Sequence, residues 1–325
     1  MKIKLLLLLL LMQFAGVCSA QIKEFYKTTT NAAILLYKKT NGQLIAHGTA
    51  FLLYNYDTTS DESILITCGH VTFHDTLIAA IPATDSLKNE FIKNKQTEII
   101  FASGGGIQTI GFDGNNLLFN IPVKPGTTCY RHPYLDLAAI FCNLPTTLVN
   151  KQNNIVSLTN LKTLPKSYIG QKDEMYAGQE ITFVGFPSGI GTQNGFLGSS
   201  MYRDRRTNPL FRKGIISWTS DNAELFLVDG FSYAGNSGSP IFSVPNSESK
   251  GKLLGMVIGH LSDEVEINDL IRDNIITDTI IKEPIENTRS IHINNGLAQC
   301  IPAYIIYDFA LQAGKRREIW LSQKK

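Results

Sequence analysis

The chain has 325 residues, of which 43% are hydrophobic and 18% are charged, and its formal net charge is +2. This length and apolar content predict one large or two small globular domains with a hydrophobic core. A net charge so close to zero argues against a nucleic acid or an anionic membrane surface as the partner.

Residues 1–20 have the pattern of a secretory signal peptide. Lys2 and Lys4 precede an apolar run over residues 5–11, and small residues then lead up to Gln21. We expect cleavage before Gln21 and export to the periplasm or the medium. The apolar run is too short to span a membrane, so no integral membrane segment is expected after cleavage. Loss of the two lysines would lower the formal charge from +2 to 0.

The cysteines leave the redox state open. Cys18 lies in the expected signal peptide, and Val17 before it disfavours a lipoprotein anchor. The other four could form two disulfides in three connectivities, but apolar, strand-like surroundings slightly favour buried thiols. No CxxC pair or other zinc-ligand spacing occurs, so the cysteine pattern predicts no zinc site. The four are Cys68, Cys129, Cys142 and Cys300.

The first half of the chain after residue 20 is a series of short apolar runs separated by turns, which indicates antiparallel β structure. The Asn41-Gly42 pair predicts a hairpin between the first two strands. Residues 82–128 are less regular, and we expect strands with a long surface insertion and a short helix over residues 87–96. The strands predicted here cover residues 32–37, 45–53, 64–71 and 137–141.

The second half continues the same pattern after a polar connection over residues 143–178. Polar residues 261–291 predict a surface excursion containing an Ile-rich strand near 275–281. Apolar residues at helical spacing after Pro302 predict a C-terminal helix over residues 302–313. The strands predicted here cover residues 181–187, 214–218, 225–228, 253–258 and 297–301. We divide the chain into a first β domain (21–150), a connection (151–180) and a second β domain with the helix (181–325).

The most distinctive stretch is residues 235–240, Gly-Asn-Ser-Gly-Ser-Pro, between two apolar runs. A serine between glycines at a tight turn can present its hydroxyl clear of the backbone, with main-chain N–H groups facing a ligand. Such clusters are also common in ordinary loops. As a nucleophile, Ser237 would need a base to take its proton and a group to orient that base.

His70 and Asp136 are the candidates for the two partners. His70 ends a strongly apolar strand, where the core would position its ring while substrate could still reach it. A lone histidine there is more often a hydrogen-bonded structural residue. Asp136 directly precedes the apolar run 137–141, although most such aspartates are turn residues. Asp113 is the competing aspartate, in what reads as an exposed turn.

Together, Thr67-Cys68-Gly69-His70-Val71, then Asp136-Leu137-Ala138, then the turn with Ser237, in this order, resemble the chymotrypsin-fold serine peptidases. The resemblance covers most of residues 30–313. It implies an all-β fold of two six-stranded antiparallel β-barrels with a C-terminal helix and the active site between the barrels. An α/β-hydrolase would need G-x-S-x-G and the order Ser, Asp, His, which this chain does not have.

Several features are similar to the bacterial, Deg/HtrA-like branch of these peptidases. Asn236 stands where trypsins carry an aspartate that pairs with a newly cut N-terminus, so activation by that route is not expected. Asp229 matches an acidic position of the bacterial branch. Gly185-Phe186-Pro187 and residues 296–302 resemble its strand-end motifs. The chain ends soon after the second barrel, so we expect no C-terminal PDZ domain.

The resemblance implies a serine endopeptidase that acts on a protein or peptide and uses no metal or organic cofactor, and the signal peptide implies that it is exported. Ser237 would be the nucleophile, His70 the general base and acid, and Asp136 the orienting group. The N–H groups of Gly235 and Ser237 would form the oxyanion hole. Two alternatives stay open. One is a binding or scaffold protein with an inactive or self-inhibited site, and the other is an esterase for small acyl substrates.

Specificity is predicted from motif position alone. Phe231, Ser232 and Tyr233 would form part of the primary pocket, and Phe231 stands where trypsins have an acidic residue. We therefore expect no selectivity for Arg or Lys. Residues 258–260 would line the substrate groove, where His260 could meet an acidic side chain, although a structural or solvent-facing role for it is more common.

Overall fold

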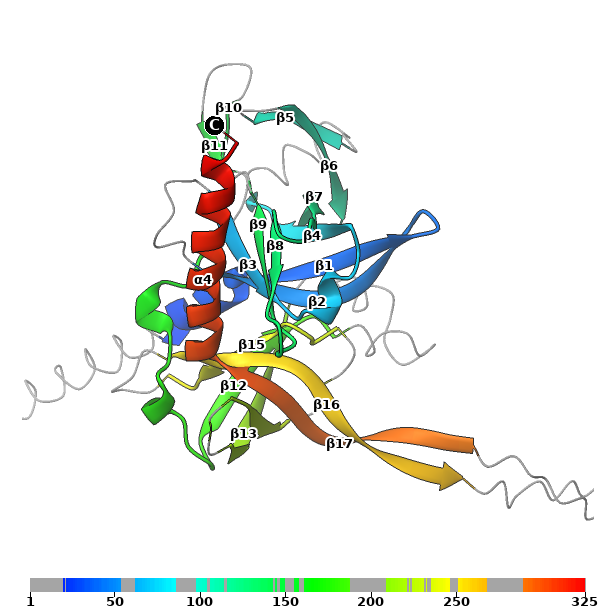
Figure 1. The fold of residues 1–325 in the computed structure, drawn as a ribbon, viewed down its shortest axis with the longest axis vertical. Coiled ribbons are helices and arrows are strands. Elements are labelled where there is room, and N and C mark those ends of the chain that lie inside the picture. Colours follow the sequence, from blue (N-terminus) through cyan, green and yellow to red (C-terminus); the bar gives the residue numbers. More distant parts are fainter. Residues whose placement is uncertain are drawn as a thin grey trace, which may run out of the picture.

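The structure is a computed structural model, and it describes residues 20, 22–53, 62–85, 98–103, 106–113, 116–142, 144, 147–149, 155–157, 161–187, 209–220, 222, 224–230, 232, 235–245, 251–267 and 289–324. The chain is mostly β, with an open curled sheet, a closed barrel and a C-terminal helix along the sheet (Figure 1). The predicted helix over 87–96 and the strand near 275–281 lie outside the described residues.

A curled nine-stranded sheet forms the first half, in the order β5-β6-β7-β4-β1-β2-β3-β9-β8. Asn41 (φ 50°) and Gly42 (φ 80°) form the predicted two-residue turn between β1 and β2. The strands are β1 (Ala33–Thr40), β2 (Gln43–Leu53), β3 (Ser63–Thr67), β4 (Thr76–Pro82), β5 (Glu98–Ser103), β6 (Gly106–Asp113), β7 (Asn116–Pro122), β8 (Cys129–Arg131) and β9 (Ala138–Cys142).

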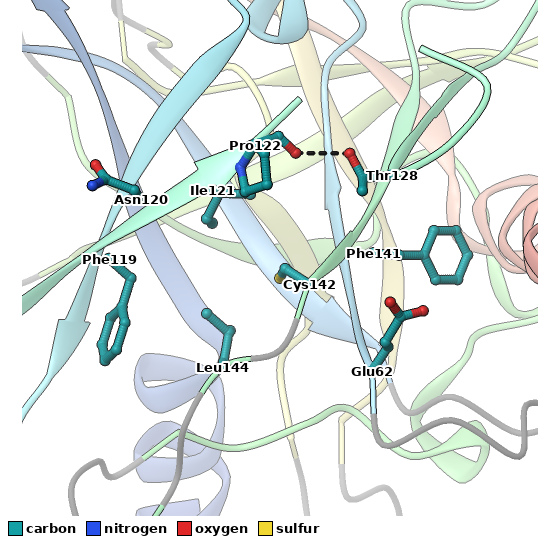
Figure 2. A pocket seen from close by; sticks show the side chains of 9 residues that line it. All are labelled: Glu62, Phe119, Asn120, Ile121, Pro122, Thr128, Phe141, Cys142 and Leu144. Atoms are coloured by element: carbon teal, nitrogen blue, oxygen red, sulfur yellow. Dashed lines mark hydrogen bonds between the residues drawn. The ribbon is translucent and has the colours of Figure 1, made fainter. Parts of the chain in front are cut away.

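The first sheet therefore differs in detail from the expected six-stranded barrel. Residues 82–128 supply the strands β5 to β7, which extend the sheet beyond β4 instead of forming only a surface insertion. A cavity of about 200 Å³ lies between β7 and β9, where the curled sheet does not close (Figure 2). Its lining is mainly apolar, with Phe119, Phe141 and Cys142 facing it and Glu62 at its rim.

The second half is a closed six-stranded barrel in the order β12-β13-β14-β17-β16-β15, as predicted. Its interior is a separate cluster of fully buried apolar side chains, among them Phe183, Phe226 and Ile241. The strands are β12 (Glu180–Gly185), β13 (Leu210–Thr219), β14 (Phe226–Asp229), β15 (Pro240–Ser243), β16 (Leu253–Ile267) and β17 (Arg289–Pro302).

Strands β16 and β17 are paired from Gly255–Pro302, inside the barrel, to Ile267–Arg289. The far part of this pair continues past the barrel as an arm (Figure 1). Residues expected to be a surface excursion are thus partly regular β structure. The short segments between the halves are β10 (Thr147–Val149), β11 (Ile155–Ser157) and two 3-10 turns, Lys166–Tyr168 and Lys172–Glu174.

Two helices cover the β structure. Residues 22–32 form a helix whose Phe25 ring packs edge-on against Phe242 of the second barrel. Helix α4 (Ala303–Ser322) begins after Pro302, as predicted, but is nine residues longer at its C-terminal end than expected. Its buried face joins the core of the first sheet through side chains such as Ile306 and Phe309. No helix among the described residues is long and apolar enough to cross a membrane.

Candidate active site

The turn that carries Ser237 connects the region after β14 to the start of β15. Gly235 and Gly238 both have φ 91°, a conformation that only glycine adopts without strain. Asn236 and Ser239 are buried, whereas Ser237 between them is partly exposed. Ser237 is therefore the serine of this turn that lies at the surface.

Strand β16 holds this turn from one side. The main-chain N–H of Gly238 donates to Val257 O at 2.8 Å, and Val257 N–H donates to Ser239 O at 2.9 Å. Strand β2 holds it from the other side, because Thr49 N–H donates to Ser237 O at 2.8 Å. The serine turn is thus bonded to a strand of each half of the molecule.

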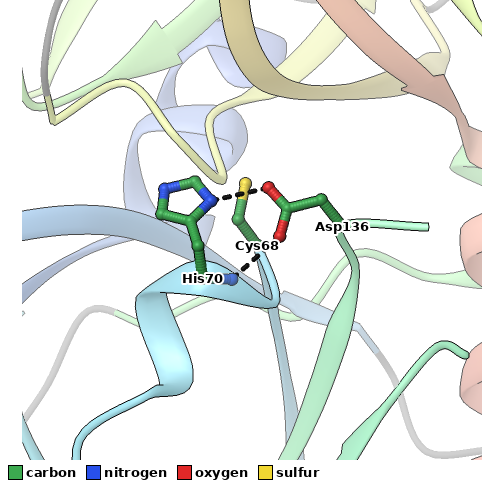
Figure 3. Close-up of side chains that lie close together, drawn as sticks. All are labelled: Cys68, His70 and Asp136. Carbon is green, nitrogen blue, oxygen red and sulfur yellow. Dashed lines mark hydrogen bonds and ion pairs between the residues drawn. The ribbon is translucent and has the colours of Figure 1, made fainter. Parts of the chain in front are cut away.

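His70 starts a single 3-10 turn, His70–Thr72, directly after β3. Its Nδ1 lies 2.6 Å from Asp136 Oδ2, and its main-chain N–H donates to Asp136 Oδ1 at 2.8 Å (Figure 3). With the proton on Nδ1, the lone pair of Nε2 faces away from Asp136. The two side chains are 42% and 33% exposed, so the pair is partly open to solvent.

Asp136 is held as an anion. Burial by itself raises the pKa of its carboxyl, but hydrogen bonds from the ring and main chain of His70 outweigh burial and lower the pKa below its usual value. Gly69 allows this approach, because a Cβ at that position would lie 3.0 Å from Asp136 Oδ1. Because Gly69 has no side chain, the Asp136 carboxylate can bond to both the ring and the main-chain N–H of His70.

Gly48 links the serine turn to the loop that carries His70. A Cβ at Gly48 would lie 2.8 Å from Val71 Cγ2 and 3.3 Å from Ser237 O, so both segments pack against this one glycine. Cys68 adds a second link, since its thiol donates to Val257 O at 3.3 Å. Within the described part of the chain, the Ser237 hydroxyl makes no hydrogen bond to the His70 ring.

The remaining predicted site residues lie in different places. Ser232 is buried, and Phe231 and Tyr233 fall outside the described residues. His260 is exposed on β16 and pairs with Ala298 of β17. Asp113, the competing aspartate, ends β6 near the far edge of the first sheet, well away from β3 in the strand order.

Sequence reasoning missed how the turn is fitted into place, although it had named Gly185 as part of a strand-end motif. A Cβ at Gly185 would lie 1.9 Å from Ser239 Oγ and 3.0 Å from Asn236 Oδ1, so β12 must end in glycine for the serine turn to pack there. Thr49 gave no local signal, because its bonds to the serine turn join residues more than 180 positions apart.

Cys68, His70 and Asp136 also lie close enough to hold a metal, with one ligand atom from each within 4.8 Å of the others (Figure 3). His70 Nδ1 and Asp136 Oδ2 are already bonded to each other. Burial raises the pKa of the Cys68 thiol well above its usual value, so it is a neutral thiol and a poor ligand. The arrangement fits an acid–base pair better than a metal site.

Together, the fold and this site define a protein of the chymotrypsin-like class, with two β units that meet at a histidine–carboxylate pair and a glycine-flanked serine turn. The sequence matches the trypsin-like peptidase domain family over residues 48–256, from β2 to β16. The chain therefore belongs to this family. Its members are peptidases, which act on proteins or peptides. No curated protein matches the chain.

Proposed function

We propose that the protein is a serine endopeptidase in which Ser237, His70 and Asp136 form the catalytic triad. The observation that supports this most is the 2.6 Å contact between His70 Nδ1 and Asp136 Oδ2. The serine turn and the loop that carries His70 also pack against one residue, Gly48. The Asp136 carboxylate would fix the imidazole with its proton on Nδ1, which leaves Nε2 as the base.

In the proposed reaction, the Ser237 hydroxyl attacks the substrate carbonyl and gives its proton to His70 Nε2. The same proton then passes to the leaving amine, and a water molecule repeats the cycle on the acyl-enzyme. The N–H groups of Gly235 and Ser237 have no acceptor among the described residues, so they are free to bind the oxyanion. One such donor lowers the barrier by about 3–4 kcal/mol.

The substrate would bind as an extended strand beside β16. After Val257, the described part of β16 pairs only with β17, and no other described strand pairs with its second edge as far as Ile267. An extended peptide can add to such an edge through its main chain, with alternate side chains giving specificity. Exposed His260 on this edge is a candidate contact for an acidic side chain. Phe231, Ser232 and Tyr233 remain our candidates for a primary pocket that does not select Arg or Lys.

The proposal extends to where the protein works and how it becomes active. Cleavage before Gln21 would leave the helix over residues 22–32 almost at the new N-terminus, with Phe25 buried against the second barrel. Asn236 is buried and carries no charge to pair with an inserted N-terminus, which supports a Deg/HtrA-like site that needs no tryptic activation. N-terminal sequencing of the exported protein tests the cleavage position.

The inactive-scaffold alternative has one observation in its favour, which is that Ser237 and His70 are not hydrogen-bonded to each other. Catalytic hydrogen bonds are often long in free enzymes and shorten with substrate, so the endopeptidase is the better reading. The esterase alternative uses the same residues and differs only in substrate.

The decisive experiment compares wild-type protein with Ser237→Ala, and uses Ser217→Ala as the matched control because Ser217 is an exposed serine on β13. We expect wild type and Ser217→Ala to cleave unfolded casein and to react with a fluorophosphonate probe, and Ser237→Ala to do neither. Hydrolysis of small esters without casein cleavage would support the esterase. No Ser237-dependent reaction at all would refute the enzyme.

A further inference from the structure

Thr49 is a fully buried polar residue of β2 whose polar atoms are all hydrogen-bonded. Its N–H donates to Ser237 O at 2.8 Å, and its hydroxyl donates to Gly235 O at 2.8 Å. The same hydroxyl oxygen accepts the N–H of Phe186 at 3.2 Å. Thr49 O accepts the hydroxyl of Thr67 at 2.7 Å. The hydroxyl of Thr49 thus joins the serine turn to the residue after β12, and its main-chain carbonyl adds a bond to the end of β3.

These bonds fix consecutive peptide units of the serine turn. The Thr49 hydroxyl holds the carbonyl of Gly235, and the Thr49 N–H holds the carbonyl of Ser237. Between them, the carbonyl of Asn236 accepts Ser239 N–H at 2.8 Å. In a trans peptide unit the N–H points opposite to the carbonyl. The N–H of Ser237 is therefore forced away from Ser239, and its direction depends on the units that Thr49 holds on either side.

Thr49 also relates the serine turn to the base. Thr67 is the last residue of β3, three positions before His70, and its hydroxyl bonds to Thr49 O. On the other side, a Cβ at Gly238 would lie 1.8 Å from the same Thr49 O, so the turn is in close contact with it. Thr49 is thus in contact with both the turn that carries the nucleophile and the strand that leads to the base, in addition to the links through Gly48 and Cys68.

We propose that Thr49 is a positioning residue, whose hydroxyl holds the backbone of the serine turn so that the Ser237 N–H and hydroxyl meet the reacting carbonyl. This inference rests on the proposed peptidase function. Thr49 does not touch substrate in this scheme. Its effect is on the transition state, since a misplacement of about 1 Å costs on the order of 100-fold in rate.

The test uses Thr49→Val, which keeps the shape of the side chain and removes the hydroxyl, and Thr49→Ser, which keeps the hydroxyl. Thr29→Val is the matched control, because Thr29 is equally buried and its hydroxyl bonds to the carbonyl of Phe25, remote from the site. We expect Thr49→Val to lower kcat by about 10- to 100-fold with KM within about threefold, as for an interaction made in the transition state. Thr49→Ser should restore most of kcat, and Thr29→Val should leave it unchanged.

A peptide aldehyde gives a second readout, because its adduct with the serine places an oxyanion at the same N–H groups. Its affinity should fall in Thr49→Val by about the same factor as kcat, which a general loss of stability would not produce. Amide hydrogen exchange gives a third readout that needs no activity, and the serine turn should exchange faster in Thr49→Val. Thr67→Val, which removes only the donor to Thr49 O, should show smaller changes of the same kind and serves if Thr49→Val does not fold.

Folded Thr49→Val with wild-type kcat, aldehyde affinity and exchange would overturn the inference while leaving the peptidase proposal intact. If the obtainable variant is Thr67→Val alone, unchanged kcat and exchange in it would have the same meaning. If the wild-type protein showed no Ser237-dependent hydrolysis, the peptidase proposal would be overturned instead. Amide hydrogen exchange in Thr49→Val would then be the one measurement left to test whether Thr49 orders the serine turn.

Discussion

Helix α4 is fastened to the first sheet by an ion pair that can be removed one charge at a time. Arg317 Nε and Nη2 donate to the two carboxylate oxygens of Glu62 at 3.0 and 2.5 Å, and Nη1 donates to Thr127 O at 3.0 Å. The side chains are only 7% and 12% exposed. The neighbouring carboxylate raises the pKa of the guanidinium further above its already high value.

Replacing Arg317 with Met should therefore take the guanidinium charge away from a carboxylate that has little access to water. Breaking a buried pair in this way costs about 3–5 kcal/mol of the free energy of unfolding. At about 2 °C per kcal/mol for a chain of this size, Tm should fall by about 6–10 °C. Adding Glu62→Gln to Arg317→Met removes the carboxylate charge that Arg317 had balanced, so the double variant should recover a large part of the loss.

The assay is urea and thermal unfolding followed by circular dichroism on wild type, both single variants and the double variant. Arg316→Met is the matched control, because Arg316 is the exposed neighbour on the same helix, and it should change stability by no more than about 0.5 kcal/mol. If Arg317→Met costs less than about 1 kcal/mol, or the double variant is no more stable than it, the ion pair does not hold the helix as argued.

Three further predictions concern the site. Asp136→Asn should lower kcat by about 10³- to 10⁴-fold with a folded protein, since an amide favours the wrong imidazole tautomer, and near-wild-type turnover would contradict the triad. Gly238→Ala should cost more than about 3 kcal/mol in urea unfolding, because its Cβ meets Thr49 O and its φ is 91°, whereas Gly126→Ala, also at positive φ but in open space, should cost only about 1–2 kcal/mol. Burial, with Lys38 and the neighbouring histidines, lowers the pKa of His47 to about 4. The unfolded chain thus binds the proton first, and stability should fall as pH drops from 6.5 toward 4, by about 1–2 kcal/mol, because solvent around the half-buried ring screens part of the shift. His47→Gln should flatten that decline, and an unchanged pH profile would show that His47 is not its source.

The class of fold was predictable because its signals are local. Strand lengths, the Asn41-Gly42 turn and the helical spacing after Pro302 each depend on neighbours in sequence, and the structure has all three. The family followed from three short motifs in a fixed order, and the match over residues 48–256 confirms it. The roles of Ser237, His70 and Asp136 stay predictions.

What could not be predicted depends on contacts between distant segments. Whether the first sheet closes depends on how its end strands β5 and β8 lie relative to each other, which no single stretch of the sequence encodes. The ion pair of Arg317 has no local sequence signal, because its partner Glu62 lies 255 positions earlier. Glycines such as Gly185 and Gly48 carry no side-chain signal, and only the packing around them shows why a Cβ is excluded there.

The four cysteines among the described residues can serve as built-in probes of unfolding. All are unpaired and buried, with Cys68, Cys129 and Cys142 in the first sheet and Cys300 in the second barrel, and burial raises the pKa of each thiol. Thiols in this state react slowly with alkylating reagents until the surrounding strands separate. Pulsed alkylation read by mass spectrometry would therefore time the opening of each half separately, with no engineered label, and would show which half gives way first.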